Sequence, residues 1–67
     1  MNKSESIKAV RRNARVTVAE ASGMASVSPT TWRLFEANTE AVTEAVRARC
    51  EGAVERMRGI AKAHEAA

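Results

Sequence analysis

The most reactive side chains in this 67-residue sequence are one cysteine, Cys50, and one histidine, His64. All eight acidic residues are glutamates, and neither aspartate nor glutamine occurs. A Ser/His/Asp triad is therefore impossible, a zinc site would need three or four clustered cysteine or histidine ligands, and a cysteine nucleophile would need a neighbouring base. We expect no enzyme, metal site, cofactor or small-molecule ligand. Cys50 is most simply a small buried apolar residue, with redox sensing as the lesser alternative.

The remaining chemistry lies in the eleven lysines and arginines, which can bind phosphate groups and base edges. Residues 1–15 carry five of them against Glu5, and residues 46–67 carry five against three glutamates. Residues 16–45 carry only Arg33 against four glutamates. A net charge of +3 and an isoelectric point near 9.8 permit a nucleic-acid partner. Because this excess of positive charge is small, the positions of individual basic residues must show whether the chain binds a nucleic acid.

The elements that position these side chains are expected to be helices in a single small all-α domain. Alanine makes up 14 of the 30 apolar residues, Leu, Ile, Val and Phe together number only 11, and no segment alternates with period two. Such a thin core favours self-association, so we expect a homodimer. No apolar run approaches the length of a signal-sequence core or a membrane span, which predicts a cytoplasmic protein without membrane contact.

The first helix is expected to begin after Asn2, whose side chain can cap it, and to run to about Arg12. Asn13 is suited to a left-handed stop. Helical spacing places a mostly apolar stripe on one face and three cations on the opposite, exposed face. The inner stripe consists of Ile7, Val10, Arg11 and Ala14, and the cations are Lys8, Arg12 and Arg15.

A second and a third helix are expected next, separated by a tight turn. Thr17 and Glu20 form a capping box, in which each side chain accepts a backbone amide of the first turn, and this helix ends before Gly23–Ser26. Ser28 caps the third helix, and Pro29 occupies its first position, where the missing N–H has no cost. We interpret the inward residues Val27, Trp32 and Phe35 as core. The outward residues are Pro29, Thr30, Arg33, Leu34 and Ala37.

A last helical stretch is expected from Glu40 to about His64, because no proline interrupts it. Its apolar residues recur every three or four positions, as in a coiled-coil seam, so residues 39–67 are predicted to be a dimerisation segment. Gly52 leaves two alternatives open, one long helix or two helices hinged at that glycine. The predicted dimer seam consists of Val46, Cys50, Ala53, Met57 and Ile60.

The segment from Val16 to Glu36 resembles, without a gap, the helix-turn-helix of the λ-repressor/Cro-like (XRE-type) DNA-binding family. The likeness covers residues 7–38, and two features depart from the family: Ser26 stands where a glycine is usual, and the C-terminal stretch differs from the family's usual fourth and fifth helices. The resemblance implies that residues 1–38 are a DNA-binding region whose third helix is the recognition helix. The positions in register are Thr17, Glu20, Ser22, Val27, Ser28, Thr31, Phe35 and Glu36.

Arg11 lies on the inner stripe of the first helix, where an unpaired guanidinium would carry a large desolvation penalty. It therefore needs a carboxylate, and Glu36 is the natural candidate. The family that this sequence resembles often pairs an arginine at this place with the glutamate that ends the recognition helix. The alternative is that Arg11 extends to solvent and Glu36 is an ordinary surface acid.

The resemblance also implies two sets of DNA contacts. Arg33 can bind guanine through two hydrogen bonds, Thr30 can add a hydroxyl contact and Leu34 can contact a thymine methyl group. The alternative for Arg33 is a solvated surface arginine. The predicted base-contact set is Pro29, Thr30, Arg33 and Leu34, and the predicted phosphate-contact set is Lys8, Arg12, Arg15, Thr17, Ser28 and Thr31.

The expected function is that of a sequence-specific transcriptional regulator, a repressor that binds an inverted-repeat operator in double-stranded DNA as a homodimer. Its two recognition helices would enter successive major grooves about 34 Å apart. A regulatory protein is a further possible partner, since 67 residues hold no sensor domain. The alternative is a helix-turn-helix-shaped protein-interaction module, such as an anti-activator or assembly adaptor, because Leu34 and Ala37 make the outward face partly apolar.

Overall fold

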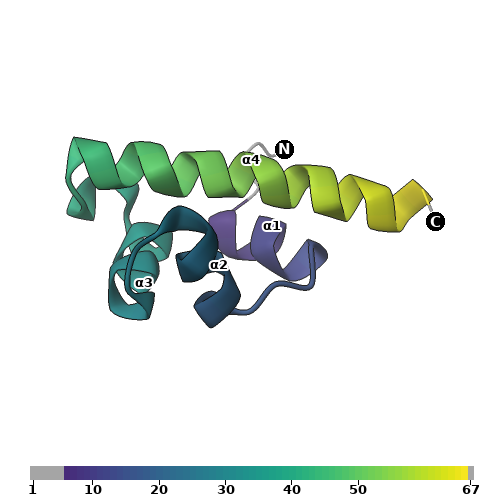
Figure 1. The fold of residues 1–67 in the computed structure, drawn as a ribbon, viewed down its shortest axis with the longest axis horizontal. Coiled ribbons are helices and arrows are strands. Elements are labelled where there is room, and N and C mark those ends of the chain that lie inside the picture. Colours follow the sequence, from purple (N-terminus) through teal and green to yellow (C-terminus); the bar gives the residue numbers. More distant parts are fainter. Residues whose placement is uncertain (1–5, 67) are drawn as a thin grey trace.

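A computed structural model describes residues 6–66, which form helices and no strand, so the predicted all-α class is confirmed. The elements are α1 (Ile7–Asn13), α2 (Val18–Ala25), α3 (Pro29–Ala37), the 3₁₀-helix η1 (Thr39–Ala41) and α4 (Glu44–Ala66). The helices α1, α2 and α3 lie together along one side of α4, which runs the length of the molecule (Figure 1). The predicted DNA-binding region, residues 1–38, therefore packs through α1–α3 against α4 of the predicted dimerisation segment, residues 39–67.

The helix α1 begins and ends differently from the prediction. The predicted Asn2 cap lies outside the described residues, and the residue that caps α1 is Ser6, whose hydroxyl accepts the Ala9 N–H at 3.1 Å. The predicted left-handed stop at Asn13 is wrong, because Asn13 is helical and the left-handed residue is Arg15, with φ 60°. A non-glycine residue in this region is uncommon, and sequence alone does not mark an arginine for it.

The predicted caps of α2 and α3 are confirmed. Thr17 Oγ1 accepts the Glu20 N–H at 3.1 Å, and Glu20 Oε1 accepts the Thr17 N–H at 2.9 Å. Ser28 Oγ accepts the Thr31 N–H at 3.1 Å, and Pro29 is the first residue of α3. These caps form because short hydroxyl side chains reach amides three residues ahead that the helix leaves without a partner.

The turn between α2 and α3 is built on a serine. The helix α2 continues through Gly23 to Ala25, which is further than predicted, and Ser26 takes the left-handed conformation with φ 59°. The Ser26 N–H donates to Gly23 O at 3.2 Å, and the Val27 N–H donates to Ser22 O at 2.9 Å. These two bonds satisfy carbonyl groups at the end of α2, as a left-handed helix stop normally does.

The helix α4 is one uninterrupted helix of 23 residues, so the alternative of a hinge at Gly52 is wrong. It begins at Glu44 rather than at the predicted Glu40, because residues 39–41 form η1. Thr43 precedes α4, and its Oγ1 accepts the Val46 N–H at 3.2 Å. The threonine thus supplies the N-terminal cap that the sequence reading missed.

The apolar seam predicted for dimerisation is mostly buried within the chain itself, so most of its surface is already covered by the chain's own helices. Cys50, Ala53 and Met57 have no exposed surface and belong to the same core as Trp32 and Phe35 of α3. Helical spacing identifies an apolar stripe, but the same stripe serves a neighbouring segment or a second chain equally well. Of the other two seam residues, Val46 is half-buried and Ile60 is 37% exposed.

One core serves the whole described chain. Four of its ten buried residues come from α4, and four of the other six are alanine or valine from α1, from α2 or from the residue that follows α1. Trp32 and Phe35 are fully buried with ring centroids 5.3 Å apart, which confirms their interpretation as core residues. Small side chains allow the helices to approach one another closely. Packing α4 onto the other helices thus provides buried apolar surface that the few leucine and isoleucine residues do not supply.

Candidate nucleic-acid interface

The helix α3 presents a solvent-exposed face opposite its buried aromatic residues. Leu34 is 49% exposed, and Arg33 is also exposed, as predicted. This face carries a guanidinium, a hydroxyl and an apolar group, the side-chain types that read base edges in the major groove. Its five exposed residues are Pro29, Thr30, Arg33, Leu34 and Ala37.

Glu36, the only acidic residue of α3, is turned away from that face. Its Oε2 accepts hydrogen bonds from Arg11 Nε and from Trp32 Nε1, both at 2.6 Å. The Arg11 and Glu36 side chains are only 11% and 12% exposed. Arg11 Nη1 also donates to Val16 O at 3.1 Å, on the connection between α1 and α2. The predicted ion pair is therefore present, and the alternative of two solvated surface charges is wrong.

The indole of Trp32 is the part of this cluster that the sequence reading missed. Trp32 was interpreted only through its ring, yet its N–H donor is satisfied by Glu36 one helical turn ahead. The spacing i, i+4 on one helix was the available signal, since side chains at that spacing are neighbours. Through Glu36, the orientation of α3 is fixed relative to α1 and to the backbone at Val16.

Two of the six predicted phosphate-contact residues cap helices, and a third, Thr31, provides the backbone amide that Ser28 caps. The side chains of Thr17 and Ser28 accept backbone amides, and Ser28 Oγ also donates to Thr31 Oγ1 at 2.9 Å. Thr17 and Ser28 are exposed, whereas Thr31 is half-buried. A hydroxyl that accepts an amide keeps its own proton for another acceptor, so the Thr17 hydroxyl remains able to donate to a phosphate.

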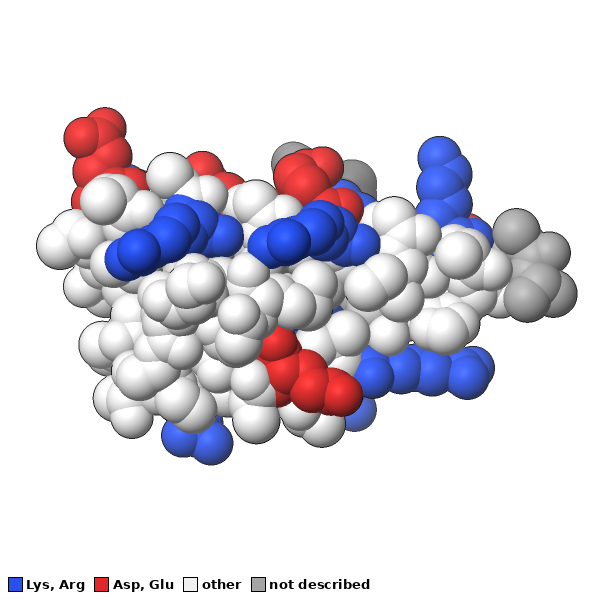
Figure 2. Space-filling model, viewed as in Figure 1, with Lys and Arg blue, Asp and Glu red and all other residues white. Residues whose placement is uncertain are grey.

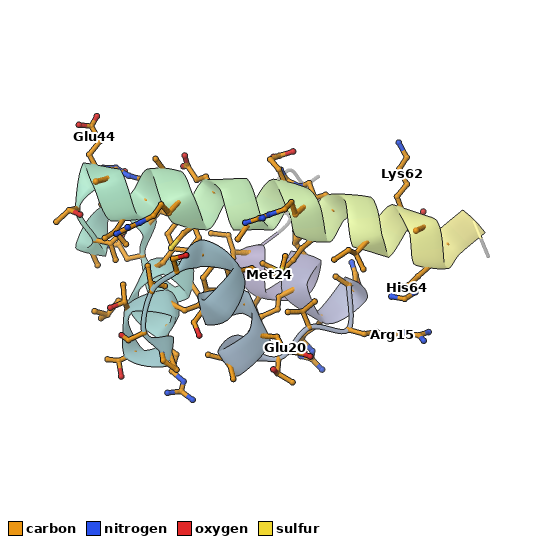
Figure 3. The ribbon with its side chains drawn as sticks, in the orientation of Figure 1. Arg15, Glu20, Met24, Glu44, Lys62 and His64 are labelled. Atoms are coloured by element: carbon orange, nitrogen blue, oxygen red, sulfur yellow. The ribbon has the colours of Figure 1, made fainter. Side chains whose placement is uncertain are left out.

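The three cations that are predicted to contact phosphate groups are exposed, but they do not lie on a single helical face. Lys8 and Arg12 lie one turn apart on α1, whereas Arg15 lies on the connection that follows α1. Figure 3 shows Arg15 pointing outward from that connection. The prediction of one face was wrong because it extended helical spacing past Asn13, where α1 ends. The three cations therefore come from two elements, α1 and the connection after it.

The surface around α2 and α3 is mixed in charge. On the face shown in Figure 2, basic side chains lie along α4 and at the opposite edge of the molecule, with an acidic group between them. Figure 3 places Glu20 on the side of α2 away from α4, and its carboxylate is committed to the Thr17 N–H. Overall charge therefore does not define a binding face, and individual contacts must do so.

Cys50 is shielded from solvent inside the core. Burial raises the pKa of its thiol above the ordinary value of 9.0, the charge of Arg49 lowers it, and the charge of Glu51 raises it. Among the described residues, no group of three His, Cys, Asp or Glu side chains could hold a metal ion. In the same part of the chain, no helix is long and apolar enough to cross a membrane.

No protein-family model, curated protein or solved structure matches this chain. The feature that distinguishes the described residues is the pairing of an exposed, carboxylate-free face on α3 with an acid held inward by Arg11 and Trp32.

Proposed function

We propose that this chain is a sequence-specific DNA-binding transcriptional regulator of the λ-repressor/Cro-like type, which places α3 in the major groove. The observation that carries the proposal is the inward position of Glu36, which leaves Arg33 on an outer face without a carboxylate. A carboxylate on that face would be repelled by the DNA phosphates. Holding Glu36 against Arg11 removes this repulsion and also anchors the helix.

Direct readout would come from three side chains of α3. Arg33 can donate two hydrogen bonds to guanine, Thr30 can donate or accept one, and Leu34 can contact a thymine methyl group. Lys8, Arg12 and Arg15 are exposed and would bind phosphates, which sets position without reading sequence.

A single chain with a single α3 is the DNA-contacting unit that this geometry supports. The predicted seam cannot join two chains while Cys50, Ala53 and Met57 are buried in the chain's own core. A homodimer on an inverted repeat would need another surface. Repression would follow from occupancy of the site, because a bound chain blocks other proteins from the same groove.

The proposal is tested by selecting binding sites from random duplexes with the purified chain, then measuring affinity and salt dependence for variants. Arg33→Ala should weaken the selected site by about 1–3 kcal/mol and relax preference at one base pair. Arg12→Ala should weaken all duplexes alike and reduce the salt slope by about one. Arg49→Ala is the matched control, since it removes an exposed arginine from α4.

Two outcomes would contradict the proposal. One is binding to every duplex weaker than about 10⁻⁴ M at physiological salt, which is below ordinary non-specific affinity. The other is an Arg33→Ala variant with the same site preference as Arg49→Ala, because Arg33 would then read no base.

A second candidate function is a protein-interaction module, and the 49% exposure of Leu34 beside Ala37 favours it. Adjacent exposed apolar side chains on one helix face can pack against a partner protein. Under this function Leu34→Glu abolishes capture of a protein partner, Arg33→Ala leaves it intact, and no duplex is selected.

A further inference from the structure

A side chain of α4 contacts the end of α2 at the turn that leads into α3. Arg56 Nη2 donates a 2.7 Å hydrogen bond to the backbone carbonyl of Met24, although 32 residues separate the two. Met24 lies in the last turn of α2, on the part of that helix beneath α4 (Figure 3). The last carbonyl groups of a helix lack partners within it and carry partial negative charge, so a guanidinium is a suitable donor.

The turn that follows Met24 contains a residue in an unfavourable backbone conformation. Ser26 is left-handed, a conformation that costs a serine more than a glycine, and two backbone hydrogen bonds hold it there. The packing of α2 on α4 also involves small residues such as Ala21 and Ala25, which restrain sliding less than large side chains. A hydrogen bond from α4 at this point fixes where α2 ends and where α3 begins.

We propose that Arg56 is a positioning residue for α3. By holding the Met24 carbonyl, Arg56 keeps the turn at Ser26 in one conformation, so that α3 is presented in one orientation. Glu36 restrains the C-terminal end of α3 through Arg11, and Arg56 restrains the turn before its N-terminal end. The consequence for base readout rests on the proposed function, whereas the consequence for the turn does not.

Arg49 provides a matched comparison for this proposal. It lies seven residues before Arg56, two helical turns along the same face of α4, and is exposed. Within residues 6–65, the side chain of Arg49 makes no hydrogen bond or ion pair, in contrast to those of Arg47, Arg56 and Arg58 on the same helix. Arg49→Ala and Arg56→Ala therefore remove the same charge from the same face, and they differ in the contact with Met24.

The experiment compares the full chain with Arg56→Ala, Arg56→Lys and Arg49→Ala. Amide hydrogen exchange of Ser26 and Val27 should accelerate about fivefold in Arg56→Ala, the factor that corresponds to roughly 1 kcal/mol at 25 °C. The amide of Ala14, which donates to Val10 O at the end of α1, lies outside the turn and should keep its wild-type rate. Arg49→Ala should match the wild type, and Arg56→Lys should retain most of the protection because lysine also donates to a carbonyl.

A second readout uses the selected DNA site and a site with one mismatched base pair. The ratio of the two affinities should fall about fivefold in Arg56→Ala and stay unchanged in Arg49→Ala, while non-specific affinity falls equally in both. Equal exchange of Ser26 in the two alanine variants overturns the proposal. Faster exchange of the Ser26 amide in Arg56→Ala with an unchanged affinity ratio overturns the role of Arg56 in orienting α3. If the wild type selects no DNA site, the proposed function fails, and the exchange rates alone decide whether Arg56 holds the turn.

Discussion

Replacing Glu36 with glutamine tests whether the ion pair with Arg11 supports the fold. The Glu36 carboxylate accepts two 2.6 Å hydrogen bonds, and both members of the ion pair are about nine-tenths buried. A glutamine oxygen can still accept a hydrogen bond, but the guanidinium of Arg11 is left without a counter-charge. Breaking a buried pair costs about 3–5 kcal/mol. Because glutamine keeps a hydrogen-bond acceptor, we expect the free energy of unfolding to fall by about 3 kcal/mol, the lower limit.

That loss is large for a chain of this size. At about 0.05–0.15 kcal/mol per residue, 67 residues have a total free energy of unfolding of roughly 3–10 kcal/mol. With a shift of about 4–8 °C for each kcal/mol, the variant should melt roughly 12–24 °C below the wild type. Urea unfolding followed by the fluorescence of Trp32, the sole tryptophan, measures the free energy directly.

Glu40→Gln is the matched control, because it makes the same chemical change in an exposed ion pair. Glu40 is 77% exposed and 3.4 Å from Arg47, so its loss should stay within about 0.5 kcal/mol. If Glu36→Gln were also within about 0.5 kcal/mol of the wild type, the buried pair would contribute nothing measurable. Glu36 would then not anchor α3.

Five further substitutions test the packing and the backbone. Gly52→Ala should stabilise the chain by about 0.5–1 kcal/mol in urea unfolding, because a Cβ at this helical glycine meets nothing within 4 Å. Ser26→Gly should also stabilise it, by up to about 1 kcal/mol, because glycine adopts the left-handed conformation without strain. The raised pKa of Cys50 means that the unfolded thiol ionises first, so its contribution to stability is complete below pH 9.0 and declines above it. Urea midpoints measured from pH 8 upward should therefore fall faster for the wild type than for Cys50→Ala. Met57→Ala should cost about 2–5 kcal/mol of stability, because Met57 is fully buried in the core. Ile60 is 37% exposed, and Ile60→Glu should leave the mass in sedimentation unchanged.

The sequence predicted the features that depend on neighbouring residues. The caps at Thr17 and Ser28 follow from hydroxyl groups placed three residues before free amides, and the structure contains both. The Arg11 pair was predictable because a buried guanidinium requires a carboxylate and α3 offers only Glu36. Each of these inferences needed only local spacing or a single complementary charge.

The features that the sequence did not predict depend on what lies across from a residue in space. The stripe on α4 was correctly identified as apolar, but its periodicity carried no information about whether α1–α3 or a second chain would cover it. The contact from Arg56 ends on a backbone carbonyl, and every residue has one, so Met24 has no identifying signal. The left-handed residues Arg15 and Ser26 are likewise set by the path of the chain rather than by their side chains.

The position of α4 links the two halves of the chain more closely than their sequences suggest. It supplies four of the ten buried core residues, including Cys50 and Met57, and it also contributes the hydrogen bond from Arg56 to the end of α2. Without α4, Trp32 and Phe35 would lose the cover that keeps them from water, and the turn before α3 would lose a restraint. Under the proposed function, a protein that displaced or bent α4 would therefore disturb DNA readout by α3 without touching its outer face.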